Sequence, residues 1–485
     1  MNYRMVVFVL GRIFLVEAAM LLLPMVCSAI YGEWYMLPAF LLPAVILLLL
    51  GLAASLRTPK NTTIYARDGL AIVALVWVLM SAFGALPFVI SGEIPAFADA
   101  FFEMVSGFTT TGSTILNDVE ALSHGALFWR SFSHWVGGMG VLVFAMAVLP
   151  MTDGRAMHLM RAEVPGPTCG KLSSKLSDSA KILYSIYFAM TALEVVLLCA
   201  GGMSLYDSLI HSFGTAGTGG FSNRALSIGA YQNPYFEWVI GIFMLLFGVN
   251  FNLYYFILMR HFREAFGSEE LRAYLGIVLF STVTIAANIL SMAGSVGEAV
   301  RTAFFQVSSI ITTTGYGTTD FNLWPTYSRI LLLLLMFVGG CAGSTAGGLK
   351  ISRVIIFFKA ARQDLNKMLH THAVTAIRFE GKPLDEKTLQ GVHNYFNVYM
   401  LLIMLSTVLV SLDGFDLTTT FTAVITCLNN VGPGMEIVGP MGNFSQFSAP
   451  VKYLLSFDML AGRLELYPML AMFAPRLWRR RRTMR

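Results

Sequence analysis

Ten long apolar stretches, separated by short polar connections, run through this sequence of 485 residues. The hydrocarbon core of a bilayer takes about 20 apolar residues per helix, and each stretch reaches that length. Charged residues make up 13% of the chain and its mean hydropathy is +0.67, which excludes an ordinary soluble protein. Because backbone that crosses lipid must satisfy its own hydrogen bonds, we predict an all-α membrane protein. The predicted spans are residues 5–31, 36–56, 69–91, 124–149, 180–201, 236–259, 272–294, 328–357, 392–411 and 450–475.

Basic residues are distributed unevenly between the two sides of a ten-span chain. One side holds five of the 33 basic residues, and the other holds most of the rest together with the run RRRR at 479–482. Lys and Arg concentrate in cytoplasmic connections, so we expect a multi-pass plasma-membrane protein with both termini in the cytoplasm. The terminal basic run is interpreted as a topology signal or a lipid-headgroup contact rather than a nucleic-acid site. The five outer residues are Arg130, Arg224, Arg301, Arg329 and Lys452.

Four segments on the outer side align with one another. They read ADAFFEMVSGFTTTGST (98–114), YDSLIHSFGTAGTGGFS (206–222), RTAFFQVSSIITTTGYG (301–317) and TTTFTAVITCLNNVGPG (418–434). In each, a helix-compatible stretch leads into a small, polar, glycine-bearing one. The aligned glycines are 108, 95 and 117 residues apart, which indicates an internal repeat. They are Gly112, Gly220, Gly315 and Gly432, although in the second copy Gly217 or Gly219 also fits.

Each aligned segment is too short to cross a membrane, since about 12 helical residues rise about 18 Å. It must enter from the outside and return as a loop, and such backbone is tolerated where it is buried or lines water. We therefore predict four tandem helix–pore-loop–helix repeats around a pseudo-fourfold pore, preceded by two extra spans. The predicted divisions are a preamble at 1–68 and repeats at 69–150, 151–262, 263–365 and 366–485, the third with a gating loop and the last with the basic C-terminus.

The glycine-bearing loops have the composition of a cation filter. Successive carbonyl oxygens can replace the water around a dehydrated cation when glycine supplies positive φ, and potassium filters use four such loops. Helix C-termini aimed at the pore favour a cation, and Asp99 and Asp207 are predicted caps at the opposite ends of two helices. The acidic outer connections would attract cations. The candidate filter residues are Thr110, Thr111, Gly112, Thr218, Gly219, Gly220, Thr313, Thr314, Gly315, Asn430, Val431 and Gly432.

The eighth span is interrupted by GGCAGSTAGG at 339–348. Its five glycines weaken a helix, so one interpretation is a break that leaves a flexible gate below the filter. The other interpretation is small-xxx-small packing against a neighbouring helix. The candidate gate residues are Gly339, Gly340, Gly343, Ser344, Thr345, Gly347, Gly348 and, from the last span, Arg463.

Arg463 lies midway along the last predicted span, where a charge is costly unless it faces water or a partner. It could lie beside the pore as an electrostatic barrier that contacts the gate. It could instead pair with Glu465 or Asp458 as a structural ion pair. Arg130, His134 and the two asparagines Asn250 and Asn252 are interpreted as structural anchors.

These motifs together resemble the Trk/Ktr/HKT superfamily of potassium transporters. The resemblance rests on TTTGST, GTGGFS, TTTGYGT and NNVGPG, and on FWRSFSHWVGGMGV (128–141), GGCAGSTAGGLK (339–350) and GRLELYP (462–468). The two-helix preamble and NNVGPG favour the bacterial TrkH/TrkG branch. The resemblance implies a subunit of the bacterial inner membrane that conducts K⁺ as its transported ion, with a gating loop below the filter. It also implies a homodimer and a cytosolic nucleotide-binding regulatory subunit of the TrkA type.

Three alternatives stay open. Serine at the first filter glycine goes with sodium permeation in plant relatives, so Gly112 favours potassium, but a sodium- and potassium-permeable transporter of the same fold is an alternative. A secondary solute transporter would carry inverted repeats, whereas these repeats run parallel. A membrane-embedded enzyme would need clustered His, Asp or Glu, and the sequence contains no HExxH, GxSxG or P-loop motif.

Overall fold

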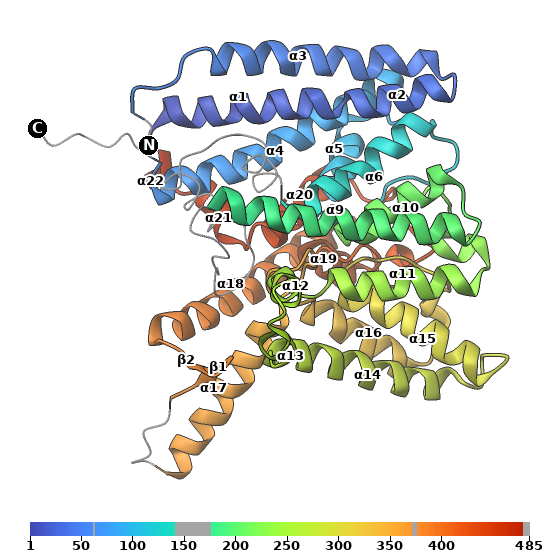
Figure 1. Cartoon of the computed structure of the whole chain (residues 1–485), viewed down its shortest axis with the longest axis vertical. Coiled ribbons are helices and arrows are strands. Elements are labelled where there is room, and N and C mark those ends of the chain that lie inside the picture. Colours follow the sequence, from blue (N-terminus) through green and yellow to red (C-terminus); the bar gives the residue numbers. More distant parts are fainter. Residues whose placement is uncertain (62–63, 141–175, 371–375, 479–485) are drawn as a thin grey trace, which may run out of the picture.

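Long helices cross the molecule side by side in the computed structural model (Figure 1), which describes residues 1–61, 64–140, 176–370 and 376–478. The chain begins with α1 (Tyr3–Met20), α2 (Leu22–Ile30) and α3 (Leu37–Ser55), which form one outer layer. α1 packs closely on α3, because a Cβ built on Gly51 would lie 2.8 Å from the carbonyl oxygen of Gly11. These helices expose many large apolar side chains, as lipid-facing helices do.

Four units follow the preamble, and in each a short helix follows a longer one and precedes another helix. The short helices are α5 (Phe97–Phe108), α10 (Leu205–Gly217), α15 (Val296–Ile311) and α19 (Leu417–Asn429), and are called the pore helices below. The other helices are α4 (Ala66–Ser91), α6 (His124–Gly138), α9 (Leu176–Ala200), α11 (Pro234–Phe247), α12 (Phe251–Leu258), α13 (Phe262–Phe266), α14 (Glu269–Ile289), α16 (Thr326–Val338), α17 (Ile351–Leu369), α18 (Glu386–Val410), α20 (Ala449–Arg463), α21 (Tyr467–Met472) and α22 (Pro475–Trp478).

Small elements complete the described part of the chain. A β-hairpin joins α17 to α18, with strands β1 (Arg378–Phe379) and β2 (Lys382–Pro383) paired antiparallel. The hairpin is a minor departure from the predicted all-helical fold. The 3₁₀ turns are η1 (Trp34–Met36), η2 (Ser227–Tyr231), η3 (Phe321–Leu323), η4 (Ser411–Asp413) and η5 (Glu436–Val438).

The described residues contain six helices long and apolar enough to span a membrane, or seven if α11 and α12 count as one bent span. Several predicted spans are therefore not single helices. The span predicted at 236–259 bends by 92° between α11 and α12. The span at 328–357 ends as helix at Val338 and resumes at Ile351, and the span at 450–475 breaks after Arg463. Residues 141–149 of the fourth span lie outside the described part.

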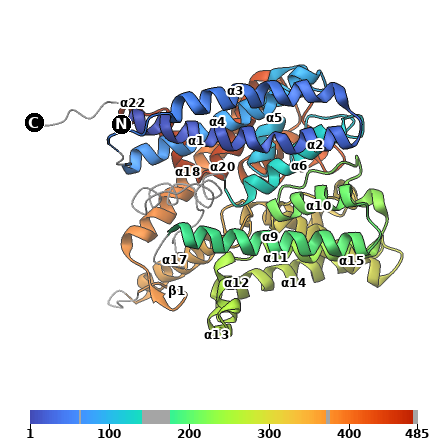
Figure 2. The same ribbon diagram turned by 45° about the horizontal axis from the view of Figure 1, so that its top comes forward.

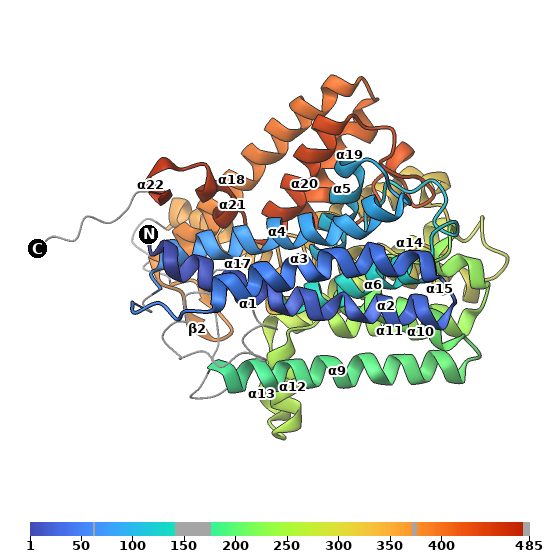
Figure 3. The same ribbon diagram turned by 90° about the horizontal axis from the view of Figure 1, so that it is seen from above.

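The two ends of the helices carry different elements. The N-terminus, α22 and the hairpin lie at one end in Figures 1, 2 and 3. The connections between α2 and α3, α9 and α10, and α14 and α15 lie at the opposite end in the same views. The pore helices α10 and α15 thus begin at the end opposite the N-terminus.

The starts of α5 and α10 correct two sequence predictions. Ser204 caps α10, and its Oγ accepts the N–H of Asp207 (3.0 Å). α5 follows Ala96, which supplies no side-chain cap. Asp99 and Asp207 are therefore first-turn residues rather than caps. They were misassigned because each helix begins about a turn earlier than its apolar pattern does. Asp99 instead pairs with the Nζ of Lys452 (2.6 Å).

Candidate functional site

The C-terminal ends of the four pore helices share one backbone structure. At the end of α5, the N–H of Thr111 donates to the carbonyl of Ser106 (2.9 Å), and the N–H of Thr110 donates to that of Gly107 (3.1 Å). This pair of bonds is a Schellman motif, which requires a left-handed residue after the helix. The same pair of bonds ends α10, α15 and α19. The left-handed residues are Thr110, Thr218, Thr313 and Asn430, with φ of 55°, 56°, 57° and 55°.

Two positions after each left-handed residue comes a left-handed glycine. Gly112, Gly220, Gly315 and Gly432 have φ of 82°, 74°, 83° and 100°. Alternating left-handed residues with residues of negative φ turns successive carbonyl groups to one side of a chain, and glycine takes this conformation without strain. In the second loop, Thr218-Gly219-Gly220 has the conformation of Thr110-Thr111-Gly112, and Gly217 is the last residue of α10.

The four loops meet in a closed ring. In every case the glycine of one loop packs against the middle carbonyl of the next loop, so closely that a side chain would not fit. The fourth loop touches the first, so the loops surround one axis. The built glycine Cβ lies 2.0 Å from the carbonyl oxygen for Gly112 with Gly219, 2.0 Å for Gly220 with Thr314, 2.2 Å for Gly315 with Val431 and 2.8 Å for Gly432 with Thr111.

A cavity of about 220 Å³ lies at one end of the ring. The four loop glycines and the residues that follow them line it, together with Arg130 and Arg224. The described residues that line this cavity include no Asp or Glu. Two of the outer acids form ion pairs with arginines. Glu436 lies 2.5 Å from Arg329, and the Oε2 of Glu120 lies 3.8 Å from Arg224.

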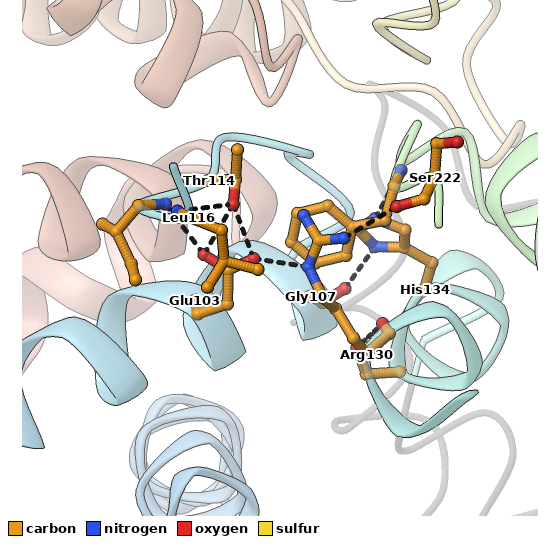
Figure 4. A network of polar contacts seen from close by, with 10 residues as sticks. Glu103, Gly107, Thr114, Leu116, Arg130, His134 and Ser222 are labelled. Atoms are coloured by element: carbon orange, nitrogen blue, oxygen red, sulfur yellow. Dashed lines mark hydrogen bonds and ion pairs between the residues drawn. The ribbon is translucent and has the colours of Figure 1, made fainter. Parts of the chain in front are cut away.

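A buried ion pair fastens the first two loops (Figure 4). The Nε of Arg130 on α6 donates to the Oε1 of Glu103 on α5 (2.5 Å), and both side chains are almost fully buried. Glu103 accepts the hydroxyl of Thr114 (2.9 Å) and the N–H of Ile115 (3.0 Å), both beyond the first loop. Arg130 donates to the carbonyl of Ser222 beyond the second loop (3.0 Å). Removing either charge would leave the other buried without its partner.

His134 on α6 bonds to the backbone of α5 and to the residue that follows the second loop (Figure 4). Its Nδ1 lies 2.7 Å from the carbonyl of Gly107, and its Nε2 accepts the N–H of Phe221 (3.2 Å). These two bonds select the neutral tautomer with the proton on Nδ1. A Cβ built on Gly219 would lie 2.4 Å from the ring, so no larger residue fits there. Arg130 and His134 thus have the anchoring geometry that the sequence predicted.

Sequence reasoning missed Glu103, His211 and Tyr316. The Nε2 of His211 on α10 contacts the hydroxyl of Ser222 (3.0 Å), and Tyr316 of the third loop donates to the carbonyl of His211 (2.9 Å). Glu103 and His211 each stand seven residues before the left-handed threonine of their loop. Three of the four aligned segments carry a polar residue at this position, the third being Gln306, and this was the available signal for Glu103 and His211.

Residues 339–350, called the gate segment below, connect α16 to α17 without helical structure. The N–H of Gly347 donates to the hydroxyl of Thr313 (2.6 Å), and the N–H of Gly348 donates to the carbonyl of Asn429 (3.0 Å). Thr313 begins the third loop and Asn429 ends α19, whereas the cavity touches the glycines at the far end of the loops. The gate segment therefore lies against the opposite end of the ring. Since it is not helical, small-xxx-small helix packing does not describe it.

The gate segment fills the break between α11 and α12. The N–H of Cys341 donates to the carbonyl of Gly248 (3.0 Å), and the N–H of Phe251 donates to the carbonyl of Gly343 (3.1 Å). Asn250 caps α12, and its Oδ1 accepts the N–H of Asn252 (3.0 Å). The two broken spans thus satisfy each other's backbone groups, as irregular backbone at membrane depth requires.

Arg463 ends α20 and donates to carbonyl groups on two sides. One guanidinium nitrogen donates to the carbonyl of Thr345 in the gate segment (2.7 Å), and another donates to that of Gly138 at the end of α6 (2.6 Å). Glu465 instead bonds to Arg353, and Asp458 accepts the hydroxyl of Ser406 (2.9 Å). Arg463 therefore makes the contact with the gate segment that its interpretation as an electrostatic barrier beside the gate required.

Comparison with known proteins identifies the relatives of this chain. Residues 37–480 match the TrkH family model, described as a cation transport protein. The chain belongs to the TrkH family. The Trk system potassium uptake protein TrkH of Escherichia coli K12 is 38% identical over 421 residues, 85% of this chain and 86% of that protein. TrkG of the same strain is 33% identical over 484 residues and covers 99% of both chains.

A solved structure of the TrkH family shares the fold. The crystal structure of the potassium transporter TrkH from Vibrio parahaemolyticus matches with a TM-score of 0.88 at 30% identity, over 99% of this chain and 100% of that one. The family and the helical, multi-pass membrane fold predicted from the sequence are thus confirmed. The ring and the gate segment bring the predicted site residues of this TrkH-family chain together, while their roles in ion passage stay predictions.

Proposed function

We propose that this chain is the membrane subunit of a potassium uptake system and conducts K⁺ through the ring of loops. The closed ring formed by the four glycine–carbonyl contacts carries the proposal. A ring of backbone carbonyls held by neighbouring loops can replace the hydration shell of a monovalent cation. The Trk proteins of E. coli named above, described as potassium uptake proteins, support potassium as the ion.

The filter consists of the four triplets at 110–112, 218–220, 313–315 and 430–432, which would bind K⁺ through their carbonyl oxygens. The ion enters from the cavity at the glycine end of the ring. The C-termini of the four pore helices face the ring and add partial negative charge. The chain itself performs no catalysis in this scheme, and K⁺ is its cargo.

The gate segment blocks the other end of the filter. Its contacts with Thr313 and Asn429, at the end of the ring opposite the cavity, support this role, and Arg463 would add a positive charge beside it. A cation leaving the filter must displace this segment. Gly339, Gly340, Gly343, Ser344, Thr345, Gly347 and Gly348 are the residues that would move.

Growth rescue and ion flux test this function. The chain should restore growth at low potassium in bacteria that lack potassium uptake, which neither a solute transporter nor a membrane enzyme would do. In proteoliposomes of the purified chain, Gly112→Ser should lower the preference for Rb⁺ over Na⁺. The physical reason is the Gly219 carbonyl, which lies 2.0 Å from the position of the new Cβ.

Gly276→Ser is the matched control, because a Cβ at Gly276 in α14 meets no atom within 4 Å. It should keep the wild-type ion preference. Equal preference for Na⁺ and Rb⁺ in the wild-type chain would favour the sodium- and potassium-permeable alternative. An unchanged preference in Gly112→Ser would remove the ring from the pathway.

The assembly and orientation are also part of the proposal. The subunit lies in the bacterial inner membrane with the N-terminus, α22 and the hairpin on the cytoplasmic side. It forms a homodimer and binds a cytosolic nucleotide-binding regulatory subunit of the TrkA type. The family and the same-end location of these elements support this arrangement. Labelling of cysteines introduced at Asn2 and Lys382 from each side of the membrane tests the orientation.

A further inference from the structure

One buried carboxylate bonds both to the gate segment and to the helix that follows it. Glu270 lies in the first turn of α14 and is 5% exposed. Its Oε1 accepts the N–H of Ala342 near the start of the segment (2.7 Å) and the N–H of Ser352 in the first turn of α17 (3.0 Å). A single charged oxygen therefore closes a loop between two positions ten residues apart. Bonds of this kind, with an ionised acceptor, are stronger than neutral ones.

A second carboxylate, from the hairpin, holds the turn that carries Glu270. Glu380 lies in the tight turn between β1 and β2 and has φ of 50°. Its Oε1 accepts the hydroxyl of Ser268 (2.8 Å) and the N–H of Glu270 (3.0 Å), and its Oε2 accepts the N–H of Glu269 (3.1 Å). These are N–H groups that a helix start leaves without a partner in the helix.

Glu380 is an addition to the ordinary capping of α14. Ser268 already caps this helix, since its Oγ accepts the N–H of Leu271 (3.3 Å). Lys359 on α17 ties the same elements together. Its Nζ lies 2.5 Å from the Oε1 of Glu269 and donates to the carbonyl of Arg378 in β1 (2.7 Å). The hairpin, α17 and the first turn of α14 thus form one polar network.

This network continues to the filter. Glu380 accepts the N–H of Glu270, and Glu270 accepts the N–H of Ala342 in the gate segment and that of Ser352 just after it. The segment in turn donates from the N–H of Gly347 to Thr313 (2.6 Å). The hairpin lies outside the packed helices, at the end where α17 projects (Figure 1). A displacement of the hairpin would therefore act on α14 first and on the gate segment through it.

We propose that Glu270 is the positioning residue of the gate segment and that Glu380 couples it to the hairpin. This inference rests on the proposed function, because it takes residues 339–350 as the gate. Without the Glu270 carboxylate, the N–H groups of Ala342 and Ser352 lose a charged acceptor in a largely buried site. The held conformation then becomes less stable relative to conformations in which the segment leaves the exit.

Cys341 provides a readout that is independent of ion flow. Its side chain is fully buried in the gate segment next to Ala342. In a variant whose other cysteines, Cys27, Cys169, Cys199 and Cys427, are replaced by alanine, Cys341 is the single thiol. We would measure its rate of reaction with a charged, membrane-impermeant thiol reagent in the purified full-length chain.

Glu270→Ala should raise the Cys341 reaction rate about tenfold. Glu270→Gln keeps an acceptor oxygen at the same reach and should raise it less. Glu380→Ala should also raise the rate, and the double variant Glu270→Ala/Glu380→Ala should match Glu270→Ala, since the two residues act in series. Lys382→Ala, on the same hairpin, is the control and should react at the wild-type rate.

Rb⁺ flux into proteoliposomes should rise in the same order as the thiol reaction. Wild-type reaction rates and fluxes in both Glu270→Ala and Glu380→Ala would overturn the proposal. If Glu270→Ala does not yield folded protein, wild-type values in Glu270→Gln and Glu380→Ala would overturn it equally. A faster thiol reaction with no Rb⁺ flux in any variant or in the wild type would support the coupling and refute the proposed ion function.

Discussion

Threonine is an unusual residue for a left-handed helix cap, yet three of the four pore helices end on one. A left-handed β-branched residue is strained by about 1–2 kcal/mol, and the surrounding structure must impose it. The hydroxyl offers a reason. At Thr313 it accepts the N–H of Gly347, and at Thr110 and Thr218 it donates to the preceding carbonyl (2.7 and 2.6 Å). A glycine here would remove the strain together with these bonds.

Arg463→Ala should raise the basal Rb⁺ flux of the purified chain severalfold. The substitution removes the donors that hold the carbonyls of Thr345 and Gly138, and it removes a positive charge beside the exit. Flux into proteoliposomes measures this. Arg463→Lys keeps the charge without the two-sided contact and should give an intermediate flux. A wild-type flux in Arg463→Ala would make the residue structural.

Glu103→Ala should destabilise the chain by about 3 kcal/mol or more, because it leaves the Arg130 charge buried without its carboxylate. The thermal unfolding midpoint of the purified protein in detergent measures the change. Glu120→Ala is the comparison, since Glu120 is half exposed and lies 3.8 Å from Arg224. Its midpoint should stay close to that of the wild type. Similar midpoints for both variants would contradict the anchoring role.

The gate segment and the α11–α12 break act as one element. Each supplies the backbone partners that the other lacks, through Gly248 with Cys341 and Gly343 with Phe251. Neither break is stable in lipid without the other, since unpaired backbone groups there are costly. The pair therefore places a non-helical segment beside the ring of loops.

Deletion of residues 341–347 should raise Rb⁺ flux, because it removes the backbone that contacts Thr313 and Arg463. Flux and size-exclusion profiles of the purified variant would be measured together. A folded variant with higher flux supports a gate. Loss of folded protein without any leak would show that the segment mainly holds α11 and α12 together.

The packing around the ring differs between the four loop glycines, so substitution by serine should not affect ion preference equally at each of them. A Cβ would approach a carbonyl to 2.0–2.2 Å at Gly112, Gly220 and Gly315, but to 2.8 Å at Gly432. Serine at the first three positions should therefore reduce Rb⁺ over Na⁺ preference more than serine at Gly432. Permeability ratios of the four variants test this order. The largest loss at Gly432 would show that the contacts do not set selectivity.

Much of this architecture was predictable from the sequence. Runs of about 20 apolar residues dictate membrane helices, and the aligned TTTG, TGG, TTTG and NNVG motifs mark the four places where a pore helix ends. The glycine run at 339–348 also indicated correctly that the helix is interrupted between α16 and α17, because clustered glycines do not sustain a helix. These features depend on neighbouring residues alone, because the backbone preferences and the hydrophobicity of a short stretch determine them.

Other features required the folded chain. The break after α11 has a local cap in Asn250, but its backbone partners lie in a segment about 90 residues away. The polar bonds from Glu103 to Arg130, and from Glu380 through Glu270 to Ala342, join residues from separate helices. The sequence alone determined which stretches enter the membrane and where loops rich in glycine and threonine interrupt them. The tertiary structure alone decided which carbonyl faces which glycine and which carboxylate holds the gate segment, because packing between distant parts of the chain sets those partners.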